Sequence, residues 1–363
     1  MQPDTRPGTH PEPEPESGTR AAVRQVQASA HGPMPGTDPM ESVLVIRGEI
    51  GAPNLPHLHQ LPDRGVGSDA IGRGAQLLEE MVVDLQPYGW RLAAAPGIDA
   101  RRAASAFRTD LNVLADAIGA EESGGTELKI QFPGPATLAA NLHLHHGERA
   151  VSDHGARRDL AQSLALGAAR HLEAVSRMTG GQKITVYIDE PDAGAVLNGT
   201  LPTSSGYRTL RSVPAAELRG WWSELVQALR GAGAAEVVIG AEAEPGTWTS
   251  LAATALEAGA DALGANAASL TVPGWELIAG AVESGTRLWL GTVDAGSKLP
   301  GVVEAVNAIR RPWRQLGLPD AALGALVLTP SSGLAELSPA QATAVLGRLA
   351  GYAEALNQVR VDG

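Results

Sequence analysis

The chain has 363 residues, a formal net charge of −12, 44% hydrophobic and 19% charged residues, and no cysteine. This acidic balance disfavours nucleic acid and anionic membranes as partners, because both require a basic footprint on the protein. The lack of cysteine excludes disulfides, thiolate zinc ligands and a cysteine nucleophile.

Residues 1–22 are rich in Pro, Glu, Gly and Thr and show no apolar periodicity, which predicts a disordered tail. This segment lacks the apolar stretch of a secretory signal. The chain also has no run of about 18 apolar residues, the length that a transmembrane helix requires. We therefore expect a cytoplasmic protein with one folded unit over residues 23–363.

Short apolar segments and helical patterns alternate along this unit. Eight segments are typical of strands: 23–30, 90–96, 127–135, 183–191, 235–244, 261–266, 286–294 and 324–333. A helix is expected from about Asp38, with Asp38 as its N-cap and Pro39 at its first position, and another over about 155–178. The last helix should begin after Ser338.

The alternation of strands and helices predicts parallel βαβ units, and about eight such units predict a single (β/α)8 TIM barrel of the α/β class. A doubly wound open sheet is the alternative. Its usual dinucleotide fingerprint is missing, because "HGPMPGT" (31–37) lacks the G-x-G-x-x-G spacing.

In a barrel the active site lies at the carboxyl ends of the strands. "VYIDEPDAGAVLNG" (186–199) places Asp189 and Glu190 at such an end. The other small or polar residues at predicted strand ends are Gly32, Gly134, Pro135, Glu242, Glu244, Asn266, Asp294, Ser331 and Ser332. We expect these groups to converge on one cleft that binds a small molecule.

Five of these strand ends resemble the C-terminal catalytic barrel of cobalamin-independent methionine synthase, whose superfamily includes uroporphyrinogen decarboxylase. "YIDEPDAGAV" (187–196) resembles the family's I-D-E-P-A motif. The weaker likenesses are "HGPMPGT" to I-G-S-x-P, "FPGPATL" (132–138) to G-P-x-T, "DALGAN" (261–266) to D-x-x-x-x-E, and "LTPSSGL" (328–334) to P-D-C-G-L. Their order and spacing agree over most of residues 25–363.

The resemblance implies S-methyl transfer from a methyl donor of the 5-methyltetrahydrofolate type to homocysteine, in methionine biosynthesis. It also implies that Asp189 binds the amino group of an amino-acid-like substrate, with Glu190 in support. A carboxylate in a partly buried cleft is a natural partner for an ammonium group. The alternatives are a solvated turn or an ion pair with an arginine.

The family's zinc ion, held by His, Cys, Glu and Cys, activates the homocysteine thiol. In this sequence those positions fall near Glu242 and Glu244, at Asn266 and at Ser332. Carboxylate, amide and hydroxyl oxygens do not suit a tight tetrahedral zinc site. No metal ligand and no cofactor are therefore assigned from the sequence.

Two further departures concern ligand binding. Pro33 replaces the serine of I-G-S-x-P, and Asn141 stands where the long enzymes have an aromatic residue that stacks on the folate. The chain also has one predicted barrel, whereas the folate-dependent enzymes carry a second.

Three polar segments could add groups to the cleft. "NLHLHHGE" (141–148) brings His143 and His145 together, as a replacement metal or substrate site or as a solvated loop. In the loop 55–73, Arg64 or Arg73 could bind a substrate carboxylate, or form an internal ion pair with Asp63 or Asp69. The segment 197–213 could form a lid or a plain connection.

Three hypotheses about function remain open at the level of the sequence. The first is a methyltransferase of the methionine synthase type. The second is a barrel enzyme of other, metal-free chemistry on a small amino-acid-like or carboxylated substrate. The third is a degenerate barrel that binds a ligand without turnover. A Ser-His-Asp hydrolase is disfavoured, because no G-x-S-x-G elbow occurs.

Overall fold

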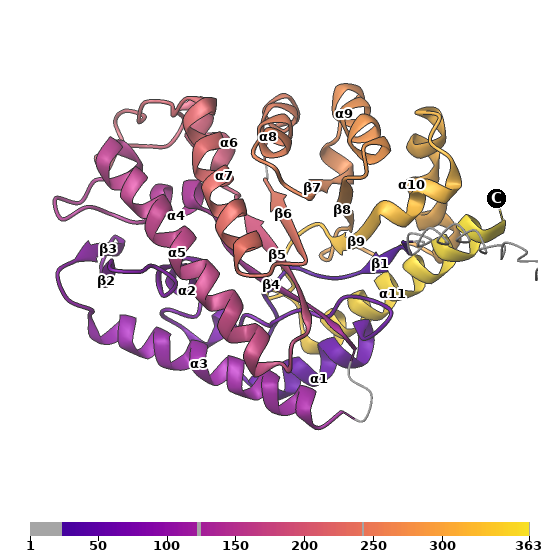
Figure 1. Ribbon diagram of the computed structural model, residues 1–363, viewed down its shortest axis with the longest axis horizontal. Coiled ribbons are helices and arrows are strands. Elements are labelled where there is room, and N and C mark those ends of the chain that lie inside the picture. The colour runs from indigo at the N-terminus through magenta and orange to yellow at the C-terminus, as the bar shows by residue number, and fades with distance from the viewer. Residues whose placement is uncertain (1–23, 122–124, 242, 363) are drawn as a thin grey trace, which may run out of the picture.

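A curled parallel sheet of seven strands forms the centre of the computed structural model, which describes residues 24–121, 125–241 and 243–362 (Figure 1). The strands are β1 (Gln27–Ala28), β4 (Glu127–Pro133), β5 (Lys183–Asp189), β6 (Glu236–Gly240), β7 (Ala262–Asn266), β8 (Arg287–Val293) and β9 (Leu326–Pro330). They lie in the order β1-β9-β8-β7-β6-β5-β4, and every neighbouring pair is parallel. The alternation of strands and helices in the sequence thus predicted the sheet type correctly.

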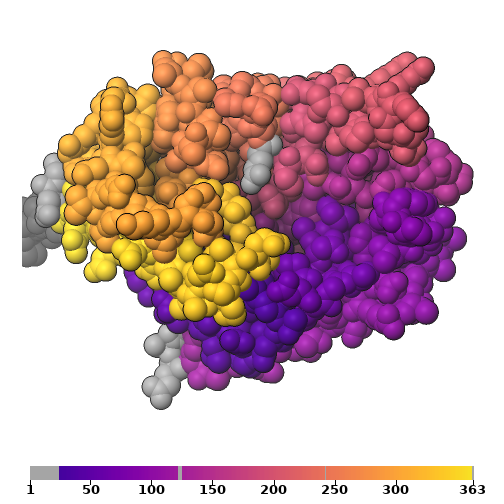
Figure 2. Space-filling view, turned by 180° about the vertical axis from the view of Figure 1, so that it is seen from behind, coloured from indigo at the N-terminus to yellow at the C-terminus, as the bar shows by residue number. Residues whose placement is uncertain are grey.

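Helices follow the strands and cover the outer face of the sheet (Figure 1). They are α1 (Pro39–Ile50), α2 (Ala70–Ala75), α3 (Ile98–Gly119), α4 (Pro135–Asn141), α5 (His154–Met178), α6 (Ala193–Asn198), α7 (Ala215–Gly231), α8 (Pro245–Glu257), α9 (Val272–Glu283), α10 (Val302–Gln315) and α11 (Pro339–Asp362). Figure 2 shows the yellow C-terminal segment beside the indigo N-terminal segment, in agreement with the contact between α11 and α1.

The predicted start of α1 is confirmed. The side chain of Asp38 accepts hydrogen bonds from the N–H groups of Met40 (2.8 Å) and Glu41 (3.2 Å), and Pro39 occupies the first turn. These bonds satisfy donors that have no partner within the helix.

The described residues form no closed eight-stranded barrel, and the prediction of a barrel strand at 90–96 is wrong. These residues overlap β3 (Gly89–Ala93), which pairs with β2 (Val82–Gln86) in a separate antiparallel hairpin. The two residues between β2 and β3 are enough to join antiparallel strands, whereas parallel strands require a long crossover.

An irregular segment, Leu55–Gln60, bridges the two edges of the curled sheet. Its first N–H donates to the carbonyl oxygen of Ala28 (3.0 Å), and its last N–H donates to that of Gly32 (2.8 Å). On the other side, the N–H of Lys129 in β4 donates to the carbonyl oxygen of Pro56 (2.8 Å). Because Pro56 has no N–H, this segment cannot form a regular ladder.

The inner face of the sheet is filled by a small apolar cluster. Its members are Leu55, Tyr187, Val238, Ala262, Trp289 and Val327. At the amino ends of the strands a polar group closes the interior. There Arg287 contacts Glu236 (3.4 Å) and donates to Gln27 (2.8 Å), and Gln27 donates to Glu127 (3.0 Å).

The predicted disordered tail, residues 1–22, lies outside the described residues. The single folded unit over 23–363 stays a prediction.

Candidate functional site

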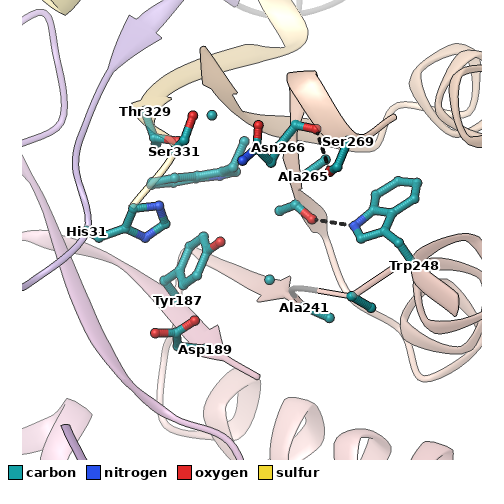
Figure 3. A pocket seen from close by; sticks show the side chains of 15 residues that line it. His31, Tyr187, Asp189, Ala241, Trp248, Ala265, Asn266, Ser269, Thr329 and Ser331 are labelled. Carbon is teal, nitrogen blue, oxygen red and sulfur yellow. Dashed lines mark hydrogen bonds between the residues drawn. The ribbon is translucent and has the colours of Figure 1, made fainter. Parts of the chain in front are cut away.

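A cavity of about 240 Å³ opens at the carboxyl ends of the strands (Figure 3). Its lining comes from the ends of β5, β6, β7, β8 and β9, from the segment just after β1 and from α8. The lining includes the side chains of His31, Tyr187, Asp189, Trp248, Asn266 and Trp289. The predicted location of a cleft, at this end of the sheet, agrees with the structure.

Aromatic rings form much of the cavity wall. The ring of Tyr187 meets that of Trp289 at a centroid distance of 5.5 Å and an angle of 62°, and that of His31 at 5.6 Å and 84°. The indole N–H of Trp248 donates to the carbonyl oxygen of Gly264 (3.1 Å, Figure 3). These contacts hold apolar ring surfaces beside the polar rim.

Two glycines make room for Tyr187 across the neighbouring strands. A Cβ atom at Gly240 would lie 1.9 Å from the phenolic oxygen of Tyr187, and one at Gly264 would lie 2.3 Å from it. Both distances are far below van der Waals contact. The glycines at these inward positions of β6 and β7 are therefore required by the packing of the tyrosine.

Asp189 lies at the end of β5 and lines the cavity (Figure 3). The amide Nε2 of Gln131 donates to its Oδ2 at 3.1 Å. The Oε1 of Gln131 accepts from the N–H of Gly32 (3.1 Å) and from the Nζ of Lys129 (2.6 Å). With two donors at its oxygen, the amide is oriented so that its nitrogen faces the carboxylate.

Gly32 does not line the cavity. Its N–H donates to the side chain of Gln131, and its lack of a side chain allows a close approach of Gln60. A Cβ at Gly32 would lie 2.7 Å from the Cδ of Gln60, whose amide in turn donates to the carbonyl oxygen of Gln131 (3.1 Å). The direct role in ligand binding that we expected for Gly32 stays a prediction.

Glu190 lies on the opposite side of β5 from Asp189 and is fully buried. Its carboxylate accepts from the N–H groups of Ala136 (3.1 Å) and Thr137 (2.8 Å), from the Thr137 hydroxyl (2.7 Å) and from the indole N–H of Trp222 (2.8 Å). Burial raises its pKa to about 7, against the opposing effect of these donors. Glu190 does not line the cavity, so the geometry is that of an anchor between β5, α4 and α7.

Of the remaining residues at strand ends, some line the cavity and others do not. Asn266 lines the cavity, and its Oδ1 accepts from the N–H of Ala268 (3.0 Å). Ser331 also lines the cavity, whereas Ser332 is exposed and lies outside the lining. Glu242 lies outside the described residues.

The three secondary candidates lie away from this cavity. His143 packs on Tyr88 at a centroid distance of 5.1 Å, and its Nδ1 is 3.3 Å from the carbonyl oxygen of Trp90. The rings of His145 and His146 contact each other at 5.1 Å. Neither His143, His145 nor Arg64 lines the cavity, and their proposed roles stay untested predictions.

Arg64 forms an internal ion pair, but with a different partner from those considered above. Its guanidinium donates to Asp110 of α3 at 2.7 Å, and Arg73 donates to the same carboxylate. Asp110 is fully buried, and His59 lies 3.3 Å from its other oxygen. This cluster connects the loop 55–73 to α3.

The donor set does not fit the zinc ion of the resembled family. Within residues 24–121, 125–241 and 243–362, no group of three or more His, Asp or Glu side chains could hold a metal ion. Glu244 and Ser332 are exposed, and the Oδ1 of Asn266 already accepts a backbone hydrogen bond. The residues at these positions offer only oxygen donors, which suit zinc poorly.

Sequence reasoning missed the inward-facing residues Lys129, Gln131, Tyr187 and Trp289. A signal for two of them was present. In "ELKIQFP" the polar residues Glu127, Lys129 and Gln131 alternate with apolar ones, and a strand with that alternation directs one set of side chains to each face.

Among the described residues, no helix has both the length and the apolar character needed to cross a bilayer.

No family model matches the chain, and no curated protein matches it. A solved structure of a B12-independent methionine synthase from Shewanella sp. W3-18-1, in complex with selenomethionine, is similar with 14% identity and a TM-score of 0.48, covering 76% of this chain and 72% of that one. A methyltransferase from Methanosarcina mazei is similar with 13% identity and a TM-score of 0.49, covering 92% and 94%. Identities and TM-scores this low leave the family of the chain open.

Proposed function

We propose that this protein binds a small α-amino acid in the cavity at the carboxyl ends of its strands, and that its reaction is S-methyl transfer to a homocysteine-like thiol. The observation that carries the proposal is the placement of Asp189. Its carboxylate lines the cavity and is held by the oriented amide of Gln131 at 3.1 Å. The methyl-transfer reaction rests on the likeness of "YIDEP" and its companion motifs, described above.

The cavity suits a ligand with one cationic and one apolar end. A carboxylate in a partly enclosed site forms charge-assisted hydrogen bonds with an ammonium group, and these are about twice as strong as neutral ones. The faces of Tyr187 and Trp289 offer apolar contact for the rest of the molecule. A volume of about 240 Å³ accommodates a molecule of amino-acid size.

The step that the donor set does not supply is activation of the thiol. In S-methyl transfer the sulfur takes the methyl group and loses its proton, and the thiolate is the reactive form. The described residues provide no zinc donor set, so activation of the thiol by zinc does not fit them. This observation favours a second candidate, another reaction on the same class of ligand at the same carboxylate.

Isothermal titration calorimetry tests the binding proposal. The probes are L-methionine, L-homocysteine and 4-(methylsulfanyl)butanoate, which is methionine without its amino group. We expect the amino acids to bind and the desamino compound to bind at least about tenfold more weakly. Asp189→Asn should lower the affinity for L-methionine by about 10- to 100-fold, because charged hydrogen bonds contribute about 1.5–3 kcal/mol.

Asp294→Asn is the matched control, because Asp294 is exposed just after β8 and does not line the cavity. This variant should bind like the wild type. Equal binding of all three probes, or of wild type and Asp189→Asn, would refute the proposal.

Turnover is a separate measurement. Methionine formation from L-homocysteine and 5-methyltetrahydrofolate, assayed with and without added zinc, tests the methyl-transfer reaction. Zinc in the protein purified without chelator, measured by mass spectrometry, should fall well below one per chain. Binding without methionine formation would support the second candidate or a binding role without turnover.

A further inference from the structure

Lys129 is a fully buried lysine on the inner face of β4, directly behind the cavity wall. Its Nζ donates to the carbonyl oxygen of Ala30 (2.6 Å) and to the Oε1 of Gln131 (2.6 Å). It also lies 4.8 Å from the ring centroid of Tyr187 and 5.6 Å from that of Trp289. One ammonium group therefore contacts β4 and three segments that line the cavity, namely β5, β8 and the segment after β1.

The contacts connect Lys129 to Asp189 through one side chain. Lys129 donates to the oxygen of the Gln131 amide, and the nitrogen of the same amide donates to Asp189. A buried cation requires a compensating charge, since the cost of removing it from water is large. Among the described residues, Asp189 is the carboxylate whose charge acts on Lys129.

In the part of the chain that the structure describes, the other titratable groups that interact with Lys129 are Tyr187 on β5, His31 after β1, and His57 in the bridging segment. Burial, followed by the charge of Lys129, lowers the pKa of His31 to about 3 and lowers that of His57 well below its usual value. Both imidazoles are thus neutral at neutral pH. Among the described residues, Lys129 and Asp189 are thus the charged pair behind the cavity wall.

We propose that Lys129 is the positioning residue of the cavity, the internal cation that compensates Asp189 until a ligand ammonium replaces it, and that ligand binding releases the proton of Lys129 to solvent. The inference rests on the proposed function, because it takes the ligand to be a cation bound at Asp189. Two cations at one carboxylate in a poorly solvated site repel each other. Proton loss from Lys129 removes that repulsion, and the neutral amine still donates to Ala30 and Gln131.

The pKa of Lys129 makes this exchange accessible near neutral pH. Burial lowers it from 10.5 to about 7, and the charge of Asp189 raises it, against that effect. A ligand ammonium at Asp189 should cancel the contribution of the carboxylate.

Lysine NMR tests the proposal directly, because the chain contains three lysines, Lys129, Lys183 and Lys298. Lys183 and Lys298 are exposed, so the conservative variants Lys183→Arg and Lys298→Arg assign their signals and leave that of Lys129. In protein labelled with [13Cε]lysine, we expect the remaining signal, that of Lys129, to titrate near neutral pH. Saturation with L-methionine should lower the Lys129 midpoint by about one pH unit or more.

Two arms separate the inference from the proposed function. In the ligand-free protein, Asp189→Asn should lower the Lys129 midpoint, and the control Asp294→Asn should not. If L-methionine fails to bind, the proposed function is refuted. The Lys129 midpoint in ligand-free Asp189→Asn still shows whether the charge of Asp189 acts on Lys129. An unchanged midpoint in Asp189→Asn overturns the inference, as does a bound state in which L-methionine leaves the midpoint unmoved.

The pH dependence of affinity gives a second readout that a purely structural lysine would not produce. Since binding releases a proton, the affinity for L-methionine should fall as the pH decreases below the Lys129 midpoint, by up to about tenfold per pH unit. Lys129→Met should abolish this dependence, and Lys183→Met, at an exposed position, should retain it. A wild-type affinity that is flat from about pH 5.5 to 8.5 would contradict the exchange.

Discussion

Asp189 and Glu190 are neighbours in the sequence, yet they belong to two different regions of the molecule. Asp189 lines the cavity inside the curled sheet, and Glu190 is buried outside it between α4 and α7. The strand alternation that sends Tyr187 and Asp189 inward sends Glu190 outward. One motif thus supplies a residue of the cavity wall and a buried residue bonded to α4 and α7, and the two can be separated by experiment.

The largest expected effect is on stability, at Glu190. Glu190→Ala leaves buried donors of Ala136, Thr137 and Trp222 without an acceptor, so we expect a loss of about 3 kcal/mol in the free energy of unfolding. Urea denaturation measures it, with Glu244→Ala as the control, because Glu244 is exposed and its side chain caps nothing. If Glu190→Ala does not fold, Glu190→Gln should show a smaller loss of the same sign. Wild-type stability in both variants would show that Glu190 is not an anchor.

Asp189→Asn should change ligand affinity and leave stability nearly unchanged, the opposite of what we expect for Glu190→Ala. The asparagine keeps an oxygen acceptor for Gln131, so we expect the free energy of unfolding to change by less than about 1 kcal/mol while the affinity for L-methionine falls. Urea denaturation and calorimetry on the same preparation test both halves. A loss of stability equal to that of Glu190→Ala would remove the distinction between the two regions.

Gly240→Ala tests the close packing of Tyr187 against β6 beside the cavity. The added methyl group would overlap the phenolic oxygen of Tyr187, and overpacking of this kind costs about 2 kcal/mol. Gly220→Ala in α7 is the control, because its added methyl group would meet no atom within 4 Å, and alanine favours a helix by up to about 1 kcal/mol. The loss at Gly240 should shrink in a Tyr187→Ala background, whereas an additive double variant would place the strain elsewhere.

The last prediction concerns the pH dependence of stability. Glu190 has a pKa of about 7 in the folded protein and 4.5 without burial, so its contribution to stability is fully present below pH 4.5 and is lost as the pH rises through 7. Lys129 has a lowered pKa of about 7 against 10.5, so the unfolded chain binds more protons between these values and stability rises there with pH. Unfolding free energies should be measured at about pH 5, 7 and 9. Glu190→Gln should reduce the fall in stability between pH 5 and 7, and Lys129→Met should reduce the rise between pH 7 and 9. Parallel curves for the wild type and both variants would contradict these assignments.

Much of the fold could be predicted from the sequence, because the signals are local. The helix cap at Asp38 and seven of the eight predicted strand segments were recognised from alternation and turn residues. The segment 90–96 was not, since a short apolar run gives no information on its partner. A hairpin strand and a barrel strand look alike until the connection before them is known.

The candidate site was predictable only in part. Its position at the carboxyl ends of the strands, and the presence there of Asp189 and Asn266, follow from the order of the elements. The order of the elements does not predict that His143, His145 and Arg64 lie away from the cavity. Their positions depend on how the loops pack against β3 and α3.

The sequence by itself determined the alternating α/β order, the strand ends and the acidic motif between them, since periodicity and turn chemistry are properties of neighbouring residues. The tertiary structure alone decided that Leu55–Gln60 bridges the sheet edges, that Glu190 is enclosed, and that Lys129 is linked to Asp189 through Gln131. Each of these depends on segments far apart in the chain, whose contacts exist only once the sheet has curled and the helices have packed against it.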